Sequence, residues 1–254
     1  TEEQKRKYVP KIASGEWVGA MGLTEPGAGS DAASIRTTAT RKGDTYLLNG
    51  TKMFITNGPI ADVLVIIAVT DKEKKAQGIS ALIVEKGFPG YSVGRELKKM
   101  GVKASTTGEL VFEDCPVPVQ NVLRQEGEGF FIALGTVEWD RSTLMAPFLG
   151  GLEYALEASV KYAKQRVQFN RPIIENQAIA FKLADMAVSI EAARLLVWHA
   201  AWMSRAGKTF DKGQGSMSKL FAGEMAVRVT EEAIQIMGGY GYVRENPVER
   251  WHRD

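Results

Sequence analysis

The spacing of apolar residues changes once along the chain, near residue 124. Between Trp17 and Leu123, apolar residues form short, β-branched runs bounded by turn residues, as in DVLVIIAV and ISALIVEK. Beyond Leu123 they recur about every 3.6 residues, the period of an α-helix, over residues 128–162, 175–206 and 213–237. Short runs between turns predict strands. The sequence therefore predicts a β-domain followed by a helical bundle.

Three domains are expected from this pattern. Residues 1–13 form a charged amphipathic segment with too little apolar surface to fold alone, which predicts the end of an N-terminal helical domain. Residues 14–124 predict a middle β-domain, an antiparallel barrel or sandwich, because strands follow one another without intervening helices. Residues 125–254 predict a truncated C-terminal helical domain. The expected fold class is α+β, and a first residue other than Met suggests an internal fragment or a processed chain.

Charge and composition limit the classes of partner. The chain has 254 residues, 44% of them hydrophobic, with 32 basic and 30 acidic residues and a formal net charge of +2. This balance gives no reason to expect nucleic acid or an anionic membrane surface as a partner. The sequence also lacks a long uncharged apolar run, and its start does not resemble a secretory signal.

Cysteine and histidine are too sparse for several kinds of site. Cys115 is the only cysteine, so an intramolecular disulfide is excluded and a reducing compartment is favoured. His199 and His252 are remote from Cys115 in the sequence and show no ligand spacing. We therefore expect neither a metal site nor a Cys-His nucleophile.

The segment LTEPGAGSD, residues 23–31, raises the question of ligand binding. Its glycines lack a Cβ atom, so backbone N–H groups there can approach an anion such as a dinucleotide diphosphate. A plain surface turn is the alternative. The segment is not the Gly-x-Gly-x-x-Gly fingerprint of nicotinamide enzymes, which follows a strand and opens a helix.

Five segments together resemble the acyl-CoA dehydrogenase family in order and spacing: GLTEPGAGSD, LNGTKMFITNG, LVFEDCPVP, RVQFNRPIIENQAIAFKLADM and QIMGGYGYVRENPVERWHRD. The resemblance implies a central β-domain between helical domains, a non-covalent FAD and α,β-oxidation of an acyl thioester. It also implies a cytoplasmic protein in a bacterium, or a mitochondrial matrix protein in a eukaryote.

The resemblance assigns residues to the FAD site: Met21, Leu23, Thr24, Gly29, Ser30, Phe54, Thr56, Arg166, Phe169, Gln235 and Gly239. Phe54 can lay its ring on the flavin, and the Thr56 hydroxyl can hydrogen-bond the ring edge. In family members, the places of Arg166 and Phe169 reach the FAD of a neighbouring subunit, which implies a homodimer or homotetramer. Taken alone, Phe54 can also be a strand core residue and Arg166 a solvated side chain.

The resemblance also addresses substrate and catalysis. Ser30, Ser105 and Arg141 correspond to residues near the acyl thioester. A carboxylate must remove the α-proton, and in most relatives this Glu lies in a segment that would follow Asp254. In a minority it immediately precedes the arginine that matches Arg141, which is the position of Asp140. An aspartate there has one methylene less reach.

Three functions stay open on the sequence alone. The first is oxidation of an acyl-CoA thioester, with electrons passed to an acceptor such as an electron-transferring flavoprotein. The second is oxidation of a thioester bound to a carrier protein. The third is a non-catalytic flavin-binding assembly protein on the same scaffold.

Overall fold

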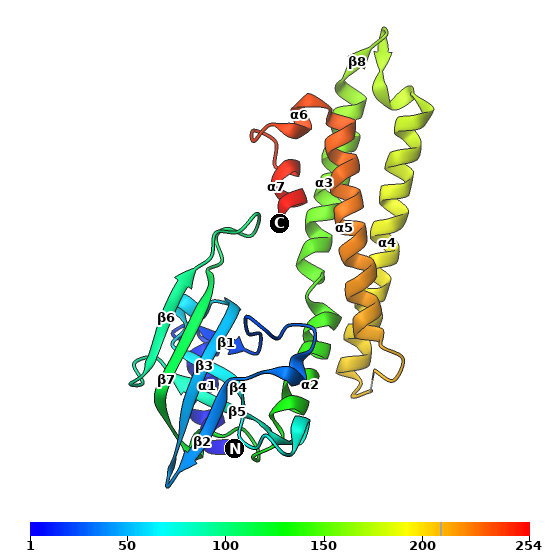
Figure 1. Ribbon diagram of the computed structural model, residues 1–254. Helices are drawn as coiled ribbons and strands as arrows, with labels where there is room; N and C mark the ends of the chain where they lie inside the picture. Colours follow the sequence, from blue (N-terminus) through cyan, green and yellow to red (C-terminus); the bar gives the residue numbers. More distant parts are fainter. Residues whose placement is uncertain (209) are drawn as a thin grey trace. The chain divides into compact units, whose positions relative to one another are not determined.

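The computed structural model describes residues 1–208 and 210–254 (Figure 1). The chain forms two compact units, Thr1–Gly135 and Thr136–Asp254. Helix α2 (Gly129–Thr143) begins in the first unit and ends in the second. The sequence-based division into domains at residues 13 and 124 stays a prediction.

The first unit, the β unit, contains one seven-stranded sheet in the order β1-β4-β2-β3-β7-β6, with β5 paired to β4. The strands are β1 (Gly19–Gly22), β2 (Thr38–Lys42), β3 (Thr45–Thr56), β4 (Val63–Val69), β5 (Ile79–Glu85), β6 (Tyr91–Glu96) and β7 (Thr107–Pro118). Three short 3-10 turns lie between these strands, η1 (Ala32–Ser34), η2 (Gly58–Ile60) and η3 (Lys75–Gly78), and a fourth, η4 (Val119–Asn121), follows β7. The sheet is curled into a half-barrel.

One feature of the sheet corrects the expectation of a purely antiparallel arrangement. Strands β1 and β2 both pair with β4 in parallel, whereas the other pairs in the sheet are antiparallel. A parallel pair needs a long connection between its strands, and the β2–β3 hairpin lies within the connection from β1 to β4. Pairing at this separation leaves no local signal in the sequence.

Strands β4 and β5 are buried on both faces. Leu64 and Ile66 belong to a core cluster that includes residues of β3 and β7. Ile67 belongs to a second cluster, against which the first turn of α2 packs. On the same side, Tyr8 of α1 (Glu2–Ala13) packs with residues of β4 and β5. Burial on both sides explains why these strands are nearly continuous apolar runs rather than alternating patterns.

Strand β3 joins two of the predicted runs. The segments around Thr45–Gly50 and Lys52–Gly58 form a single strand up to Thr56, with two register shifts against β7. The second shift lies between Lys52 and Ile55, where Phe54 adopts a left-handed backbone with φ 60°. A bulge of this kind changes the direction in which a side chain points.

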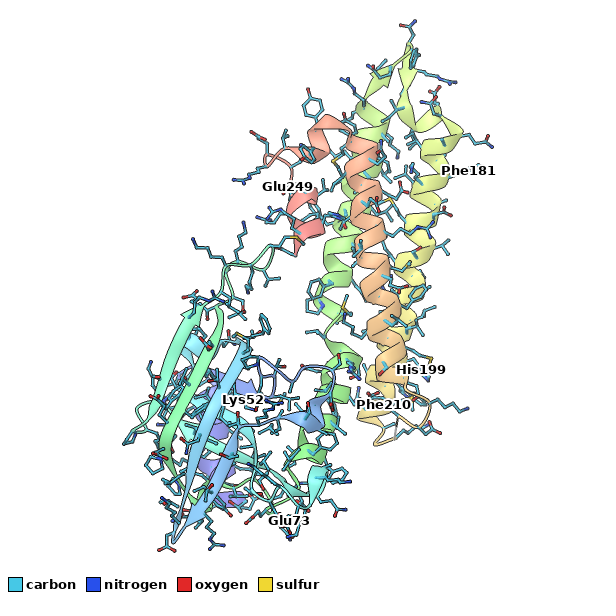
Figure 2. The ribbon with its side chains drawn as sticks, in the orientation of Figure 1. Lys52, Glu73, Phe181, His199, Phe210 and Glu249 are labelled. Carbon is cyan, nitrogen blue, oxygen red and sulfur yellow. The ribbon has the colours of Figure 1, made fainter. Side chains whose placement is uncertain are left out.

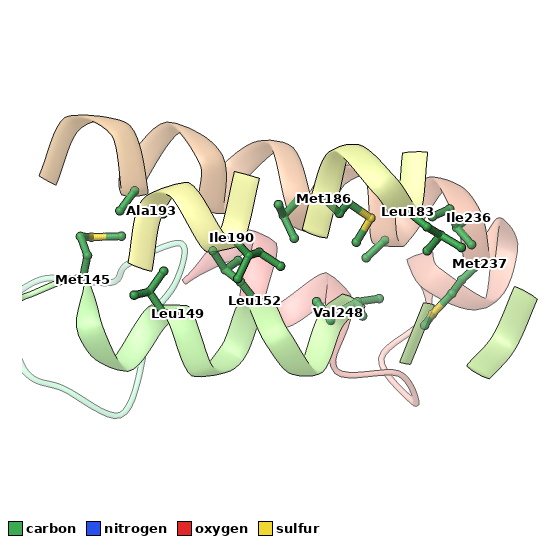
Figure 3. Close-up of a cluster of buried hydrophobic side chains, with 14 of the residues drawn as sticks. Met145, Leu149, Leu152, Leu183, Met186, Ile190, Ala193, Ile236, Met237 and Val248 are labelled. Atoms are coloured by element: carbon green, nitrogen blue, oxygen red, sulfur yellow. The ribbon is translucent and has the colours of Figure 1, made fainter. Parts of the chain in front are cut away.

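The second unit, the helical unit, contains three long helices that lie side by side (Figure 1). They are α3 (Ala146–Gln165), α4 (Gln177–Arg205) and α5 (Gln214–Met237), followed by the short α6 (Gly239–Tyr242) and α7 (Val248–Arg253). The hairpin β8 (Val167–Gln168) and β9 (Arg171–Pro172), with the turn η5 (Ile173–Glu175), connects α3 to α4. Buried apolar side chains from the three long helices and α7 form the core (Figure 3).

The three predicted helical stretches match these helices, with one difference. The stretch 128–162 is divided into α2 and α3 at Leu144 and Met145. Pro147 lies in the first turn of α3, where its missing N–H costs nothing but where it prevents continuation of the preceding helix. Within residues 1–208 and 210–254, no helix has the length and apolar character needed to cross a membrane.

Tyr46 generates a prediction about alkaline stability. Its buried hydroxyl donates a hydrogen bond of 2.5 Å to Glu126, and burial, together with this carboxylate, raises the pKa of Tyr46 from 10.0 to about 12. The protonated phenol is favoured in the folded chain, so its contribution is complete below pH 10 and is lost as the pH rises towards 12. We expect unfolding free energies to fall by up to roughly 2–3 kcal/mol over this range.

Urea unfolding of the wild type and of Tyr46→Phe across this pH range measures the effect. The variant should lack this part of the pH dependence. Parallel pH profiles for the two proteins would contradict the assignment.

Candidate flavin site

Backbone hydrogen bonds attach the loop Leu23–Ser30 to strand β3. Met53 N–H donates to the carbonyl of Thr24 at 2.8 Å. Glu25 and Ala28 exchange two backbone hydrogen bonds of 2.9 and 3.2 Å, which close the tip of the loop. Both of these residues are buried, whereas the residues around them, Pro26, Gly27, Gly29 and Ser30, are exposed. The loop is thus anchored at its base and open to solvent along its outer side.

A buried ion pair lies beneath this loop. The ammonium of Lys52 is 2.7 Å from a carboxylate oxygen of Glu25 and also donates to the carbonyl of Leu23 at 3.0 Å. The Glu25 carboxylate accepts further hydrogen bonds from the backbone N–H groups of Arg36 and Thr37, at 2.6 and 3.0 Å. Burial alone would raise the pKa of Glu25, but the hydrogen bonds from Lys52 and its neighbours lower it below its usual value.

The loop glycines answer the question raised by the sequence. A Cβ atom added at Gly27 or Gly29 would meet no other atom within 4 Å, and neither residue has a positive φ. Neither the turn conformation nor the packing of the described residues therefore requires glycine here. Close approach of a ligand to the backbone, the reason proposed from the sequence, is compatible with this open space.

Phe54 and Thr56 lie near the loop on the same strand. Phe54 directly follows Met53, which is bonded to the loop, and its side chain is 63% exposed. Thr56 is exposed as well. The structure therefore does not place Phe54 in the core, which was the alternative for this residue. A large aromatic ring on a left-handed backbone and in solvent is unfavourable by itself, which indicates a binding role.

Ser105 lies two residues before β7 (Thr107–Pro118), whose first residue pairs with the last residue of β3, Thr56. Asn57 N–H, next to Thr56, donates to the carbonyl of Thr106 at 2.9 Å, and Ser105 immediately precedes Thr106. The buried hydroxyl of Thr106 has no hydrogen-bond partner among the described residues. Such a polar atom is expected to have a partner in the functional state.

A second group of predicted residues meets in the helical unit. Arg166, Gln235 and Gly239 line one pocket of about 560 Å³ with Tyr162, Gln168, Ile173, Ile236, Met237, Gly238, Tyr240 and Val243. The Arg166 guanidinium and the Gln235 amide are exposed and hydrogen-bond to no other described side chain. An unpaired guanidinium beside glycine backbone suits the oxygens of a diphosphate.

Phe169 lies at the tip of the β8–β9 hairpin and is 94% exposed. Phe169 and Asn170 form its two-residue turn with φ 52° and 61°. Such turns favour Asn and Gly, and a bulky aromatic residue is strained there. Phe169 is not among the residues that line the pocket, and the β8–β9 hairpin lies at one end of the helical unit (Figure 1).

On helix α2, the side chain of Arg141 pairs with Glu138. Arg141 is 3.9 Å from Glu138 and 3.4 Å from the hydroxyl of Ser216, and Asp140 is exposed. Glu138 approaches Gly215, and one of its carboxylate oxygens is buried without a partner among the described residues. Sequence reasoning missed Glu138, because an acidic residue near a helix surface gives no distinct signal.

The geometry divides the predicted site residues into two groups. Met21, Leu23, Thr24, Gly29, Ser30, Phe54, Thr56 and Ser105 belong to the β unit. Asp140, Arg141, Arg166, Phe169, Gln235 and Gly239 belong to the helical unit. Their assignment to FAD or substrate stays a prediction. Within residues 1–208 and 210–254, no three His, Cys, Asp or Glu side chains are grouped to hold a metal ion.

The β unit thus contains a curled half-barrel sheet, and the helical unit contains three long helices packed side by side. Two family profiles match the chain: the acyl-CoA dehydrogenase middle domain over residues 20–115 and the acyl-CoA dehydrogenase C-terminal domain over residues 127–254. The chain belongs to the acyl-CoA dehydrogenase family.

Individual relatives resemble the whole chain. An acyl-CoA dehydrogenase of Bacillus subtilis is 52% identical over 253 residues, covering 100% of this chain and 66% of the relative. The structure of butyryl-CoA dehydrogenase from Megasphaera elsdenii is 49% identical with TM-score 0.96, covering 100% of this chain and 66% of that one. A prolyl acyl carrier protein oxidase is 38% identical with TM-score 0.97, covering 100% and 67%. The chain thus spans about two thirds of the length of these relatives.

Phe169 allows binding to be separated from stability. Phe169→Asn removes the ring and places a residue that tolerates the left-handed region in the turn, so we expect equal or slightly higher thermal stability. We expect weaker binding of FAD, by about tenfold if stacking of the ring contributes on the order of 1 kcal/mol or more. Thermal melts and fluorescence titration of apoprotein with FAD measure the two effects.

The neighbouring turn residue provides the matched control. Asn170→Gly keeps a residue suited to positive φ and leaves Phe169 in place, so FAD affinity should stay at the wild-type level. Wild-type affinity in Phe169→Asn would exclude Phe169 from the cofactor site.

Proposed function

We propose that this protein is a FAD-dependent acyl-CoA dehydrogenase that introduces an α,β double bond into an acyl thioester. The observation that carries the proposal is the loop Leu23–Ser30, which is anchored to β3 beside the exposed Phe54 and Thr56. Anchored backbone, an open outer side and an exposed aromatic ring provide donors and a stacking surface. Family membership supports the same reading.

The residues present fit FAD. In the β unit, Phe54 would stack on the flavin, and the Thr56 hydroxyl and the loop backbone would donate hydrogen bonds to it. The unpartnered Thr106 hydroxyl, the exposed Ser30 and the half-buried Ser105 are available to cofactor or substrate. Bound FAD supplies the redox chemistry as hydride acceptor, and the protein orients the reactants and excludes competing reactions.

In the helical unit, the pocket around Arg166, Gln235 and Gly239 would receive the diphosphate and adenosine end of an FAD held by a neighbouring subunit. Phe169 is 94% exposed at the tip of the β8–β9 hairpin, which supports contact of its ring with the same neighbouring cofactor. We therefore propose a homodimer or homotetramer. An electron-transferring flavoprotein is the proposed electron acceptor.

Short acyl-CoA thioesters are the proposed substrates, because butyryl-CoA dehydrogenase is among the most similar solved structures. A thioester on a carrier protein is the second candidate, supported by the TM-score of 0.97 to a prolyl acyl carrier protein oxidase. A non-catalytic flavin-binding protein is the third. Butyryl-CoA and prolyl carrier protein are therefore the two diagnostic substrates.

Anaerobic reduction of the bound flavin tests this proposal. We expect the purified protein to be yellow with FAD and to lose its visible flavin absorbance when butyryl-CoA is added. Bleaching by prolyl carrier protein alone would favour the second candidate. A yellow protein that neither thioester bleaches would contradict catalysis, and a protein that cannot take up FAD would contradict the whole proposal.

Asp140 tests the position of the catalytic base. Asp140→Asn is nearly isosteric and removes basicity, so a catalytic Asp140 would lose several orders of magnitude in flavin reduction while FAD and thioester still bind. We expect a loss below about a hundredfold, because Asp140 is exposed and one methylene shorter than the glutamate of relatives. Stopped-flow reduction measures the rate, and a collapse with intact binding would make Asp140 the base.

A further inference from the structure

The Lys52–Glu25 pair is the most deeply buried ion pair among the described residues, and none of the proposed roles uses it. Lys52 is 0% exposed and Glu25 is 7% exposed. Lys52 lies within the β unit, two residues before Phe54 (Figure 2). Its side chain passes beneath Gly22 of β1, where an added Cβ would come within 3.2 Å of the lysine stem. A side chain larger than glycine at position 22 would therefore crowd the stem of Lys52.

Three segments of the chain converge on this pair. Lys52 belongs to β3, Leu23 and Glu25 to the loop, and Arg36 and Thr37 to the segment before β2. The ammonium binds the carbonyl of Leu23, and Met53 N–H binds the carbonyl of the next residue, Thr24. Two neighbouring residues of β3, Lys52 and Met53, thus donate hydrogen bonds to the carbonyls of Leu23 and Thr24.

Stability alone does not account for the pair. The cost of taking two charges out of water offsets much of their attraction, so apolar replacements of such pairs are often neutral or stabilising. The loop packs on the β unit through Leu23 and Ala28, whereas Pro26, Gly27, Gly29 and Ser30 are exposed. The contacts of Lys52 and Glu25 add to this packing by holding the backbone at the base of the loop.

We propose that Lys52 and Glu25 are positioning residues for the flavin, which hold the backbone of Leu23 and Thr24 in the conformation that binds the cofactor. Neither side chain reaches the cofactor, and both act through the loop. This inference rests on the proposed function and names the support of the same site. Loss of the pair therefore weakens cofactor binding beyond any loss of general stability.

Four variants separate positioning from stability. Glu25→Gln and Lys52→Met each remove one charge with little change in side-chain size, and Lys52→Met/Glu25→Gln removes both, so that no buried charge is left unpaired. Leu82→Ala is the matched control, because Leu82 is fully buried on β5 in the core cluster and belongs to neither the loop nor its anchoring contacts. Its cavity destabilises the same unit without changing the loop.

The readouts are the apoprotein melting temperature, the FAD dissociation constant from fluorescence titration, and the visible circular dichroism of bound flavin. We expect the dissociation constant to rise at least about tenfold in both single variants and in the double variant, since hydrogen bonds to charged groups are lost. The flavin dichroism should change in shape. Leu82→Ala should lower the melting temperature and change the dissociation constant by less than about twofold.

Two results would overturn the inference. The first is wild-type FAD affinity in the folded double variant, whose backbone groups have lost their charged partners. The second is an equal loss of affinity in Leu82→Ala at equal melting temperature, which would make the effect one of stability. Wild-type protein that binds no FAD would overturn the proposed function, whereas wild-type binding retained by every variant overturns only the role of Lys52 and Glu25.

Discussion

A lysine ammonium cannot remain in an apolar core without hydrogen-bond partners and a counter-charge, and this constraint organises the β unit around Lys52. The lysine enters beneath β1, meets Glu25 and a loop carbonyl, and Glu25 in turn satisfies two backbone N–H groups before β2. One interaction therefore fixes how β1, β3 and the chain leading to β2 come together. The outer side of the loop needs no packing of its own and is left open for a ligand.

Backbone strain and exposure coincide at two aromatic residues. Phe54 and Phe169 have positive φ values, and both side chains are largely in solvent. Each position combines two unfavourable features, one conformational and one of solvation, that a folded chain normally avoids. We propose that each of these side chains contacts a ring system of a bound ligand. An exposed aromatic ring would then be presented to a ligand by a strand bulge at Phe54 and by a hairpin tip at Phe169.

Sequence pattern predicted the strands and helices well because burial imposes their periods locally. The apolar run of β4 and the helical period of α4 and α5 can be read from the sequence without knowledge of the tertiary contacts. The parallel pairing of β1 with β4 was missed, since it depends on partners distant in sequence. Lys52 and Glu25 were missed for a related reason: each resembles a surface residue until the other is beside it. Arg166, Gln235 and Gly239 meet in one pocket, but their assignment came from resemblance to a family rather than from periodicity.

We propose that the loop Leu23–Ser30 and the bulge at Phe54 form one preorganised flavin site. A crystal structure of the protein with bound FAD would test this arrangement. We expect a flavin ring against Phe54, hydrogen-bonded to the loop backbone, with the backbone of the loop and the Lys52–Glu25 pair unchanged. A flavin bound elsewhere, or a loop whose backbone is rebuilt around the cofactor with the ion pair broken, would contradict it.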